Sequence, residues 1–191
     1  MKHANYLVIV AIVLGTTAGL TGCKKTTGGG ALTGLLYGGK ITLGFQMRCK
    51  NVAGSGHITG QFQYNDHTND VAFHGLIDKP LQAITQAQEL ELETCEDVDT
   101  ILADSGISGA LFGWVDLIQP GSGQLGTYTP QPKNLGEGGE LGVLVVIENT
   151  NVELDCPTGT KGLIVQLSGG VYDGYLEGGC LDHGNFTIFE E

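Results

Sequence analysis

Apolar and polar residues alternate in several short stretches of the chain, and this alternation predicts β-strands. Within Leu35–Met47, every second residue from Ile41 onward is apolar, which is the period of a strand that buries one face. The same period recurs in His57–Tyr64 and in Val71–Ile77, and polar turns lie between them. We therefore expect a run of half-buried strands joined by tight turns.

The second half of the chain carries further strand patterns and one long loop. Leu141–Glu148 contains a continuous apolar run, as in a strand buried on both faces. Gln119–Gly139 is rich in Gly and Pro and is expected to be a loop. Other strands are expected over Leu81–Cys95, Gly109–Ile118, Leu163–Leu167 and Asn185–Phe189. About eight or nine short strands predict one all-β domain over 35–191, a single antiparallel β-sandwich or a flattened β-barrel.

Composition agrees with this fold class and excludes several functions. The chain has 191 residues, 32 of them Gly, without the three-residue period of collagen. Its hydrophobic fraction of 41% is too high for a disordered protein. Its net charge is −12 with nine Lys and Arg in total, so it has no basic surface with which to neutralise the phosphates of nucleic acid.

The N-terminal segment has the three parts of a secretory signal. Lys2 gives a positive start, Tyr6–Leu14 is a short apolar core, and a run of small residues and Thr follows. The segment ends in Leu20-Thr21-Gly22-Cys23, which fits the bacterial lipobox, where the Cys thiol is acylated and the signal is cut just before it. The apolar core is shorter than the roughly 20 residues of a spanning helix.

The sequence therefore predicts that residues 1–22 are a lipoprotein signal peptide and that Cys23 carries the lipid. The protein would be exported and anchored to a bacterial membrane, with plain secretion and a retained anchor as alternatives. Lys24–Ala31 (KKTTGGGA) has three successive glycines, so we expect residues 23–34 to be a flexible linker that lifts the domain off the bilayer.

Four further cysteines are an even number in an exported protein, which implies disulfide bonds. Three pairings are possible. We expect Cys49–Cys95 because each of these cysteines ends a predicted strand in the same half of the domain. Cys156–Cys180 is expected because these two flank the strand Leu163–Leu167 and its glycine bend.

Asp66, His67 and His74 form the best candidate chemical group. An Asp-His pair in a turn beside a His on the next strand could hold zinc or another divalent metal, with Tyr64 and Asp173 as possible additions. The alternative is structural. Asp66 would then accept hydrogen bonds from backbone N–H groups just after it, His67 would lie at the turn, and His74 would share a face with Ala72 and Leu76. We favour the structural interpretation, since Asp is a common turn residue.

Two weaker patterns complete the candidate chemistry. An acidic set could bind calcium, although it lacks the spacing of a known calcium loop and is more simply a solvated face. This set comprises Glu89, Glu91, Glu93, Glu96, Asp97 and Asp99. Asp182-His183 and Ser168 suggest a hydrolase triad, but no Gly-x-Ser-x-Gly elbow surrounds any Ser.

Several stretches resemble the post-COAP-1 family, a small β domain of exported bacterial proteins. Gly38–Arg48 (GGKITLGFQMR) looks like the family's opening glycines and Thr-x-Gly-Phe strand, and Gly56–His67 (GHITGQFQYNDH) is similar to its Gly-x-x-x-Tyr-x-Asp-His segment. His74 falls where the family often has a His. Gly170–Phe189 resembles its Tyr-Asp and Gly-Asn-Ile endings. The resemblance covers roughly 35–191 and implies a β fold without an established activity.

Together these patterns predict a lipid-anchored cell-envelope protein that acts as a non-enzymatic binding or structural module. It would need no cofactor, and its partner would be an unidentified protein or glycan. The alternative is a metal-binding protein or metal-dependent enzyme that uses Asp66, His67 and His74.

Overall fold

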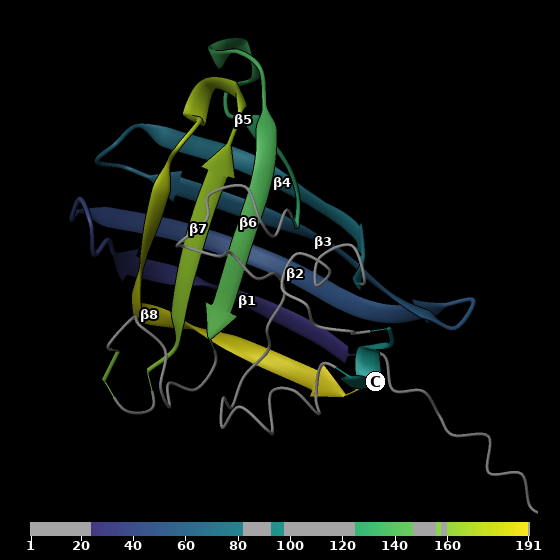
Figure 1. The fold of residues 1–191 in the computed structure, drawn as a ribbon. Coiled ribbons are helices and arrows are strands. Elements are labelled where there is room, and N and C mark those ends of the chain that lie inside the picture. The colour runs from purple at the N-terminus through teal and green to yellow at the C-terminus, as the bar shows by residue number, and fades with distance from the viewer. Residues whose placement is uncertain (1–23, 82–92, 98–124, 147–155, 158–159, 191) are drawn as a thin grey trace, which may run out of the picture.

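Eight antiparallel strands follow one another around a closed ring in the computed structural model, which describes residues 24–81, 93–97, 125–146, 156–157 and 160–190 (Figure 1). Each strand pairs with the next along the chain, and the last pairs with the first. The strands are β1 (Lys24–Thr33), β2 (Lys40–Val52), β3 (Ser55–Asp66), β4 (Val71–Pro80), β5 (Gly126–Pro130), β6 (Gly139–Val146), β7 (Gly162–Ser168) and β8 (Leu176–Glu190). Two short 3-10 turns, η2 (Lys133–Leu135) and η3 (Gly170–Tyr172), lie in the loops after β5 and β7. The all-β prediction is confirmed.

The ring is flattened because β8 turns a corner between two layers. Residues 176–180 of β8 pair with β7, whereas residues 181–190 pair with β1. In Figure 1, β6 and β7 cross the strands β1–β4 at a steep angle instead of lying alongside them. The predicted closing strand, Asn185–Phe189, is therefore the end of a much longer element.

Strands β2, β3 and β4 bury every second residue, as their sequences predict. Their inward side chains bring together the large aromatic rings of the core. Phe62 lies at the centre, with its ring centroid 5.8 Å from that of Phe45 and 6.0 Å from that of Phe73. Phe62 and Phe73 are almost fully buried. Aromatic pairs in such contacts contribute beyond the area that they bury, so this cluster stabilises the whole layer.

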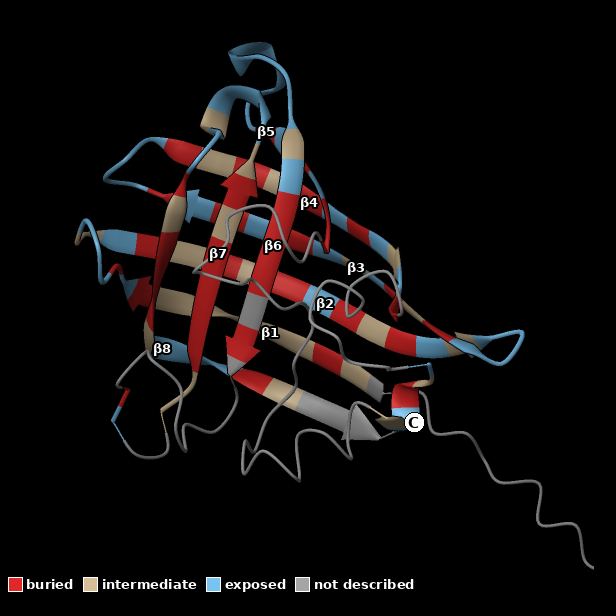
Figure 2. Cartoon of the chain, in the orientation of Figure 1, coloured by how far each residue is buried: buried red, intermediate tan, exposed pale blue. Residues whose placement is uncertain are grey.

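β7 is buried on both faces. Leu163, Val165 and Leu167 belong to the core, and Ile164, which lies between them and points outward, is only 6% exposed. In β6, Leu141, Gly142 and Val143 are all buried, which confirms the prediction of a doubly buried strand for that part of Leu141–Glu148. Figure 2 shows β7 almost wholly in the buried colour, whereas β2 is banded.

The prediction of a flexible linker over residues 23–34 is wrong, because Lys24–Thr33 is strand β1. It pairs with β2 over its full length and with β8 on its other side. The glycines of β1 let it lie close to its neighbours, because a side chain at these positions would clash with them. A Cβ atom at Gly28 would lie 2.4 Å from the Phe186 ring, and one at Gly30 would lie 2.1 Å from the His183 carbonyl oxygen. The run of glycines therefore lets a strand close the ring over aromatic side chains.

The loop predicted over Gln119–Gly139 also contains structure, since β5 and η2 lie within it. Tyr128 is 2% exposed, and its hydroxyl donates a hydrogen bond to the Gly169 carbonyl oxygen, 2.5 Å away. This buried ring fixes a short strand in a sequence otherwise typical of a loop.

Two other predicted strands, Gly109–Ile118 and most of Leu81–Cys95, lie outside the described residues. At the described ends of the second segment, Leu81 is helical and a helical turn begins at Cys95.

Candidate functional site

Asp66 shapes the turn between β3 and β4, as the structural interpretation predicts. Its carboxylate is fully buried, and Oδ1 accepts hydrogen bonds from the backbone N–H groups of Thr68 (2.9 Å) and Asn69 (3.1 Å). Oδ2 accepts two more, from the Asn69 side-chain amide at 2.7 Å and from the Tyr175 hydroxyl at 2.8 Å. Four donors therefore occupy both oxygens of this carboxylate.

The same carboxylate ends a buried chain of hydroxyl groups. The Tyr64 and Tyr175 hydroxyl oxygens are 2.7 Å apart, and because Tyr175 donates to Asp66, Tyr64 donates to Tyr175. Burial raises the pKa of both tyrosines far above the ordinary value. Burial also opposes ionisation of Asp66, but the hydrogen bonds from Asn69, Tyr175 and Thr68 outweigh it and lower its pKa. Asp66 is thus ionised at neutral pH and the tyrosines are not.

The structure does not bring Asp66, His67 and His74 together. Asp66 points inward, whereas His74 lies on the outer face of β4 with Ala72 and Leu76, as predicted. His67 is exposed at the turn, with Nε2 3.3 Å from the Thr42 hydroxyl. Within the described ranges, no group of three or more His, Cys, Asp or Glu side chains is placed to hold a metal ion.

The two additions suggested for that site also have other partners. Tyr64 belongs to the buried hydroxyl chain. Asp173 accepts a hydrogen bond from the Gly169 N–H, 2.6 Å away in the loop between β7 and β8. Tyr64 therefore contacts a core hydroxyl and Asp173 holds a backbone N–H group, and neither contact involves the two histidines.

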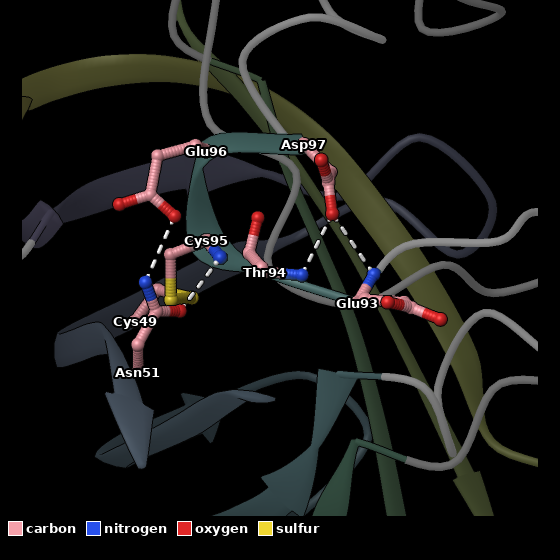
Figure 3. The surroundings of a disulfide bond; sticks show 7 residues. All are labelled: Cys49, Asn51, Glu93, Thr94, Cys95, Glu96 and Asp97. Atoms are coloured by element: carbon pink, nitrogen blue, oxygen red, sulfur yellow. Dashed lines mark hydrogen bonds between the residues drawn. A yellow bond between two sulfur atoms is a disulfide. The ribbon is translucent and has the colours of Figure 1, made fainter. Parts of the chain in front are cut away.

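Both predicted disulfides are formed. The Cα atoms are 5.8 Å apart in Cys49–Cys95 and 5.5 Å apart in Cys156–Cys180, within the usual range. Figure 3 shows how Asn51 supports the first bridge: its side-chain oxygen accepts the Cys95 N–H at 2.9 Å, and its NH2 group donates to Glu96 at 2.8 Å. This bridge therefore ties β2 to the segment that follows β4.

The described members of the acidic set are engaged locally. Asp97 Oδ2 accepts the backbone N–H groups of Thr94 (2.7 Å) and Glu93 (3.0 Å), and this lowers its pKa (Figure 3). The hydrogen bond from Asn51 lowers the pKa of Glu96. Glu89, Glu91 and Asp99 lie outside the described residues. The Asp97 carboxylate thus holds the backbone just before the helical turn, and the Glu96 carboxylate holds the turn to Asn51 of β2.

The other triad candidates are separated by the fold. The Asp182 carboxylate accepts a hydrogen bond from the Thr33 hydroxyl at 2.8 Å. Ser168 is the last residue of β7 and lies near the start of β8, because Gln166 pairs with Leu176. The pairing of the two strands ends at the other end of β7, where Gly162 pairs with Cys180. Asp182 and His183 lie on the part of β8 beyond that pairing.

Sequence reasoning missed Glu177, a fully buried carboxylate on β8. It accepts the backbone N–H groups of Leu36 and Tyr37, each at 2.9 Å, and thereby holds the loop between β1 and β2. That loop exposes the side chains of Leu35, Leu36 and Tyr37. The sequence around Glu177 did not indicate this role, because the two N–H groups that it accepts lie some 140 residues earlier in the chain.

The outer face of β2, β3 and β4 carries two hollows, which the sequence also did not reveal. The first, of about 570 Å³, is lined by outward residues that include Thr42, Gly44, Gln63, Asn65, His74 and Gln131. The second, of about 450 Å³, is lined by Gln46, Thr59, Gln61, Leu76 and Asp78 among others. They lie side by side because Gly44, Gln63 and His74 form one register row, and Gln46, Gln61 and Leu76 form the next outward row.

Cys23 lies outside the described residues, directly before β1. In the part of the chain that the structure describes, no helix has the length and apolar character needed to cross a bilayer. No protein-family model matches the chain, and no curated protein or solved structure matches it either.

Proposed function

We propose that this protein is a lipid-anchored component of a bacterial cell envelope that acts as a non-enzymatic binding or structural module. The observation that carries the proposal is Leu20-Thr21-Gly22-Cys23, a lipobox-like end to an apolar signal core, directly before the first strand of the domain. The resemblance to the post-COAP-1 family belongs to the same proposal and rests on the motifs in the sequence alone.

One feature supports export and a second supports attachment through a lipid. Cys49–Cys95 and Cys156–Cys180 are disulfides, and such bonds persist in oxidising compartments outside the cytoplasm. The net charge of −12 repels anionic membrane surfaces, so membrane attachment would need the lipid.

Because Lys24–Thr33 is a strand and not a flexible linker, the proposed lipid would be attached close to the domain. Because β1 begins at Lys24, a lipid on Cys23 would be attached within about 4 Å, one Cα–Cα step, of the barrel itself. The domain would stand against the bilayer instead of moving on a tether. The loop Leu35–Tyr37 would lie at the far end of β1, about 30 Å away for a ten-residue strand.

A binding or structural role is favoured over catalysis by how the candidate groups are used. Asp66 is saturated by hydrogen bonds to its turn and to Tyr175, and His74 faces the opposite side of the sheet. Among the described residues, no group of His, Cys, Asp or Glu side chains has the arrangement that the metal-dependent alternative requires.

Metabolic labelling with a palmitate analogue tests the proposal. The wild-type chain should incorporate label and lose residues 1–22, whereas Cys23→Ser should remain unlabelled and keep its signal. Thr21→Ser is the control, since it alters the same motif but keeps a small residue, and it should be labelled normally. Normal processing and localisation of Cys23→Ser would contradict the proposal.

A further inference from the structure

The two hollows on the outer face of β2–β4 form one shallow surface that is mostly polar. Amides and hydroxyls dominate it, contributed by Thr42, Gln46, Gln61, Gln63 and Asn65. Among the described residues that line the hollows, Asp78 is the sole carboxylate and none is Lys, Arg or Glu. In a chain of net charge −12, the residues that line the two hollows include one carboxylate, and Arg48 lies in the same outward register row as that carboxylate.

The one carboxylate of the surface already has a partner. Asp78 Oδ1 lies 2.5 Å from His57 Nε2 at the edge of the second hollow. The row Gly44, Gln63 and His74 in the first hollow contains no carboxylate and no lysine or arginine. A ligand here meets groups that both donate and accept hydrogen bonds, because an amide offers an oxygen and an NH2 group and a hydroxyl offers both roles.

The depth of the first hollow comes from Gly44. A Cβ atom added there would meet nothing closer than the Gly28 carbonyl oxygen at 3.9 Å, so the space above this residue is open. The backbone is extended strand, which any residue can adopt. The surrounding polar side chains extend from paired strands, so their Cα positions are fixed relative to one another.

We propose that this outer face of β2–β4 binds a neutral polysaccharide. Sugar hydroxyls both donate and accept hydrogen bonds and carry no charge, and amide and hydroxyl side chains complement them. Leu76, 52% exposed, offers an apolar contact for the C–H groups of a sugar ring. The proposal names the partner of the binding module, and in that respect rests on the proposed function.

Other classes of partner fit this surface less well. Nucleic acid needs Lys and Arg to neutralise phosphates. The cores of protein interfaces are enriched in aromatic residues, Met and Arg. Here the aromatic residues beside the first hollow, Tyr64 and Phe73, are buried in the core.

The test uses the full chain, purified in detergent, with three neutral hexasaccharides and one charged polymer. Chitohexaose, cellohexaose and maltohexaose are titrated by calorimetry, with polygalacturonate as the anionic comparison. We expect saturable binding of at least one neutral hexasaccharide and none of polygalacturonate. Binding of none of the three, or of the anionic polymer alone, overturns the proposal.

Three variants locate the site. Gly44→Thr places a side chain on the floor of the first hollow, where an added Cβ atom meets nothing closer than 3.9 Å, and should weaken binding at least tenfold. Gln63→Ala removes one amide and should weaken binding about threefold to tenfold, the value of one hydrogen bond. Gln166→Ala is the matched control, since Gln166 is an outward glutamine on β7 and should bind like the wild type. Wild-type affinity in both Gly44→Thr and Gln63→Ala, each folded by circular dichroism, overturns the assignment of the face.

Failure of this proposal is distinguishable from failure of the proposed function. Lipid attachment is read from labelling of Cys23, whereas glycan binding is read in vitro and does not depend on the lipid. Protection of Leu76 from hydroxyl-radical oxidation by a bound hexasaccharide gives a second readout. A bound sugar that leaves Leu76 as reactive as before contradicts the location.

Discussion

The strands β3 and β7 pair with neighbours on both sides in the same ring, yet their outward faces differ. On β3 the outward residues Thr59, Gln61, Gln63 and Asn65 are polar and exposed. On β7 the outward Ile164 is 6% exposed, and Gln166 and Ser168 are half-buried. Inward, both strands carry fully buried apolar residues. In the layer that contains β7, side chains on both faces are therefore buried, whereas in the layer that contains β3 the outer face is exposed to solvent.

This difference separates two kinds of substitution. A change to an outward residue of β7 removes buried area and should lower the free energy of unfolding. A change to an outward residue of β3 or β4 removes little buried area and should leave stability almost unchanged. Function, if it resides on the open face, can therefore be altered there without loss of the fold.

The largest expected effects come from the disulfides, one in each layer. Cys49–Cys95 holds β2 of the open layer, and Cys156–Cys180 holds β8 where it pairs with β7. Their sequence separations of 46 and 24 predict losses of about 4 and about 3.5 kcal/mol on removal. The measurement is urea unfolding of the two paired Cys→Ala variants.

The order of the two losses shows whether loop length or burial of side chains determines the contribution of each disulfide. If the account is right, loop length decides it, and the Cys49–Cys95 pair costs slightly more. A much larger loss for Cys156–Cys180 would mean that the doubly buried layer depends on its bridge and not on burial of its side chains.

A smaller effect is expected from a matched pair of aliphatic side chains. Ile164→Ala removes a buried side chain from the outer face of β7 and should cost about 2–3 kcal/mol. Leu76→Ala removes an outward side chain that is 52% exposed on β4 and should cost less than about 1 kcal/mol. Chemical denaturation measures both, and equal costs would abolish the distinction between the two layers.

An effect smaller than that of Ile164→Ala is expected at the buried carboxylate at the end of β3. The pKa of Asp66 is lowered in the folded state, so its ionised form stabilises the fold above the ordinary value of 3.8, and this contribution is lost as the pH falls through the folded-state pKa. Asp66→Asn should cost about 1–2 kcal/mol at pH 7, and the cost should shrink below about pH 4.

The control for that titration lies in the same turn. Asp70 is exposed, and its backbone has φ 57°, which Asn also tolerates. Asp70→Asn should therefore keep the wild-type free energy of unfolding at pH 7. A cost for Asp66→Asn that stays constant from pH 7 to pH 3 would mean that its ionisation does not stabilise the turn.

The sequence predicted those parts of the molecule that depend on local chemistry. Alternation in β2, β3 and β4 was visible because a strand with one buried face has a period of two. The turn role of Asp66 followed from its preference for nearby backbone N–H groups. Both disulfides followed from the order of strands.

The missed features depend on contacts between distant segments. In the sequence, the glycines of β1 are typical of a linker. In the fold, the rings of Phe45 and Phe186 lie beside Gly28 and leave no room for a side chain there. Glu177 acquires its role only when β8 meets the loop after β1. The hollow over Gly44 requires the register of three strands, which no single stretch encodes.

Hydroxyl-radical footprinting of the folded wild-type protein, read by mass spectrometry, tests the central claim most directly. Leu76 and Ile164 are both aliphatic and both point outward, but they are 52% and 6% exposed. Leu76 should be oxidised several-fold faster than Ile164 in the native state, and the two rates should converge in urea. Equal native rates, or faster oxidation of Ile164, would contradict the division of the ring into an open and a covered layer.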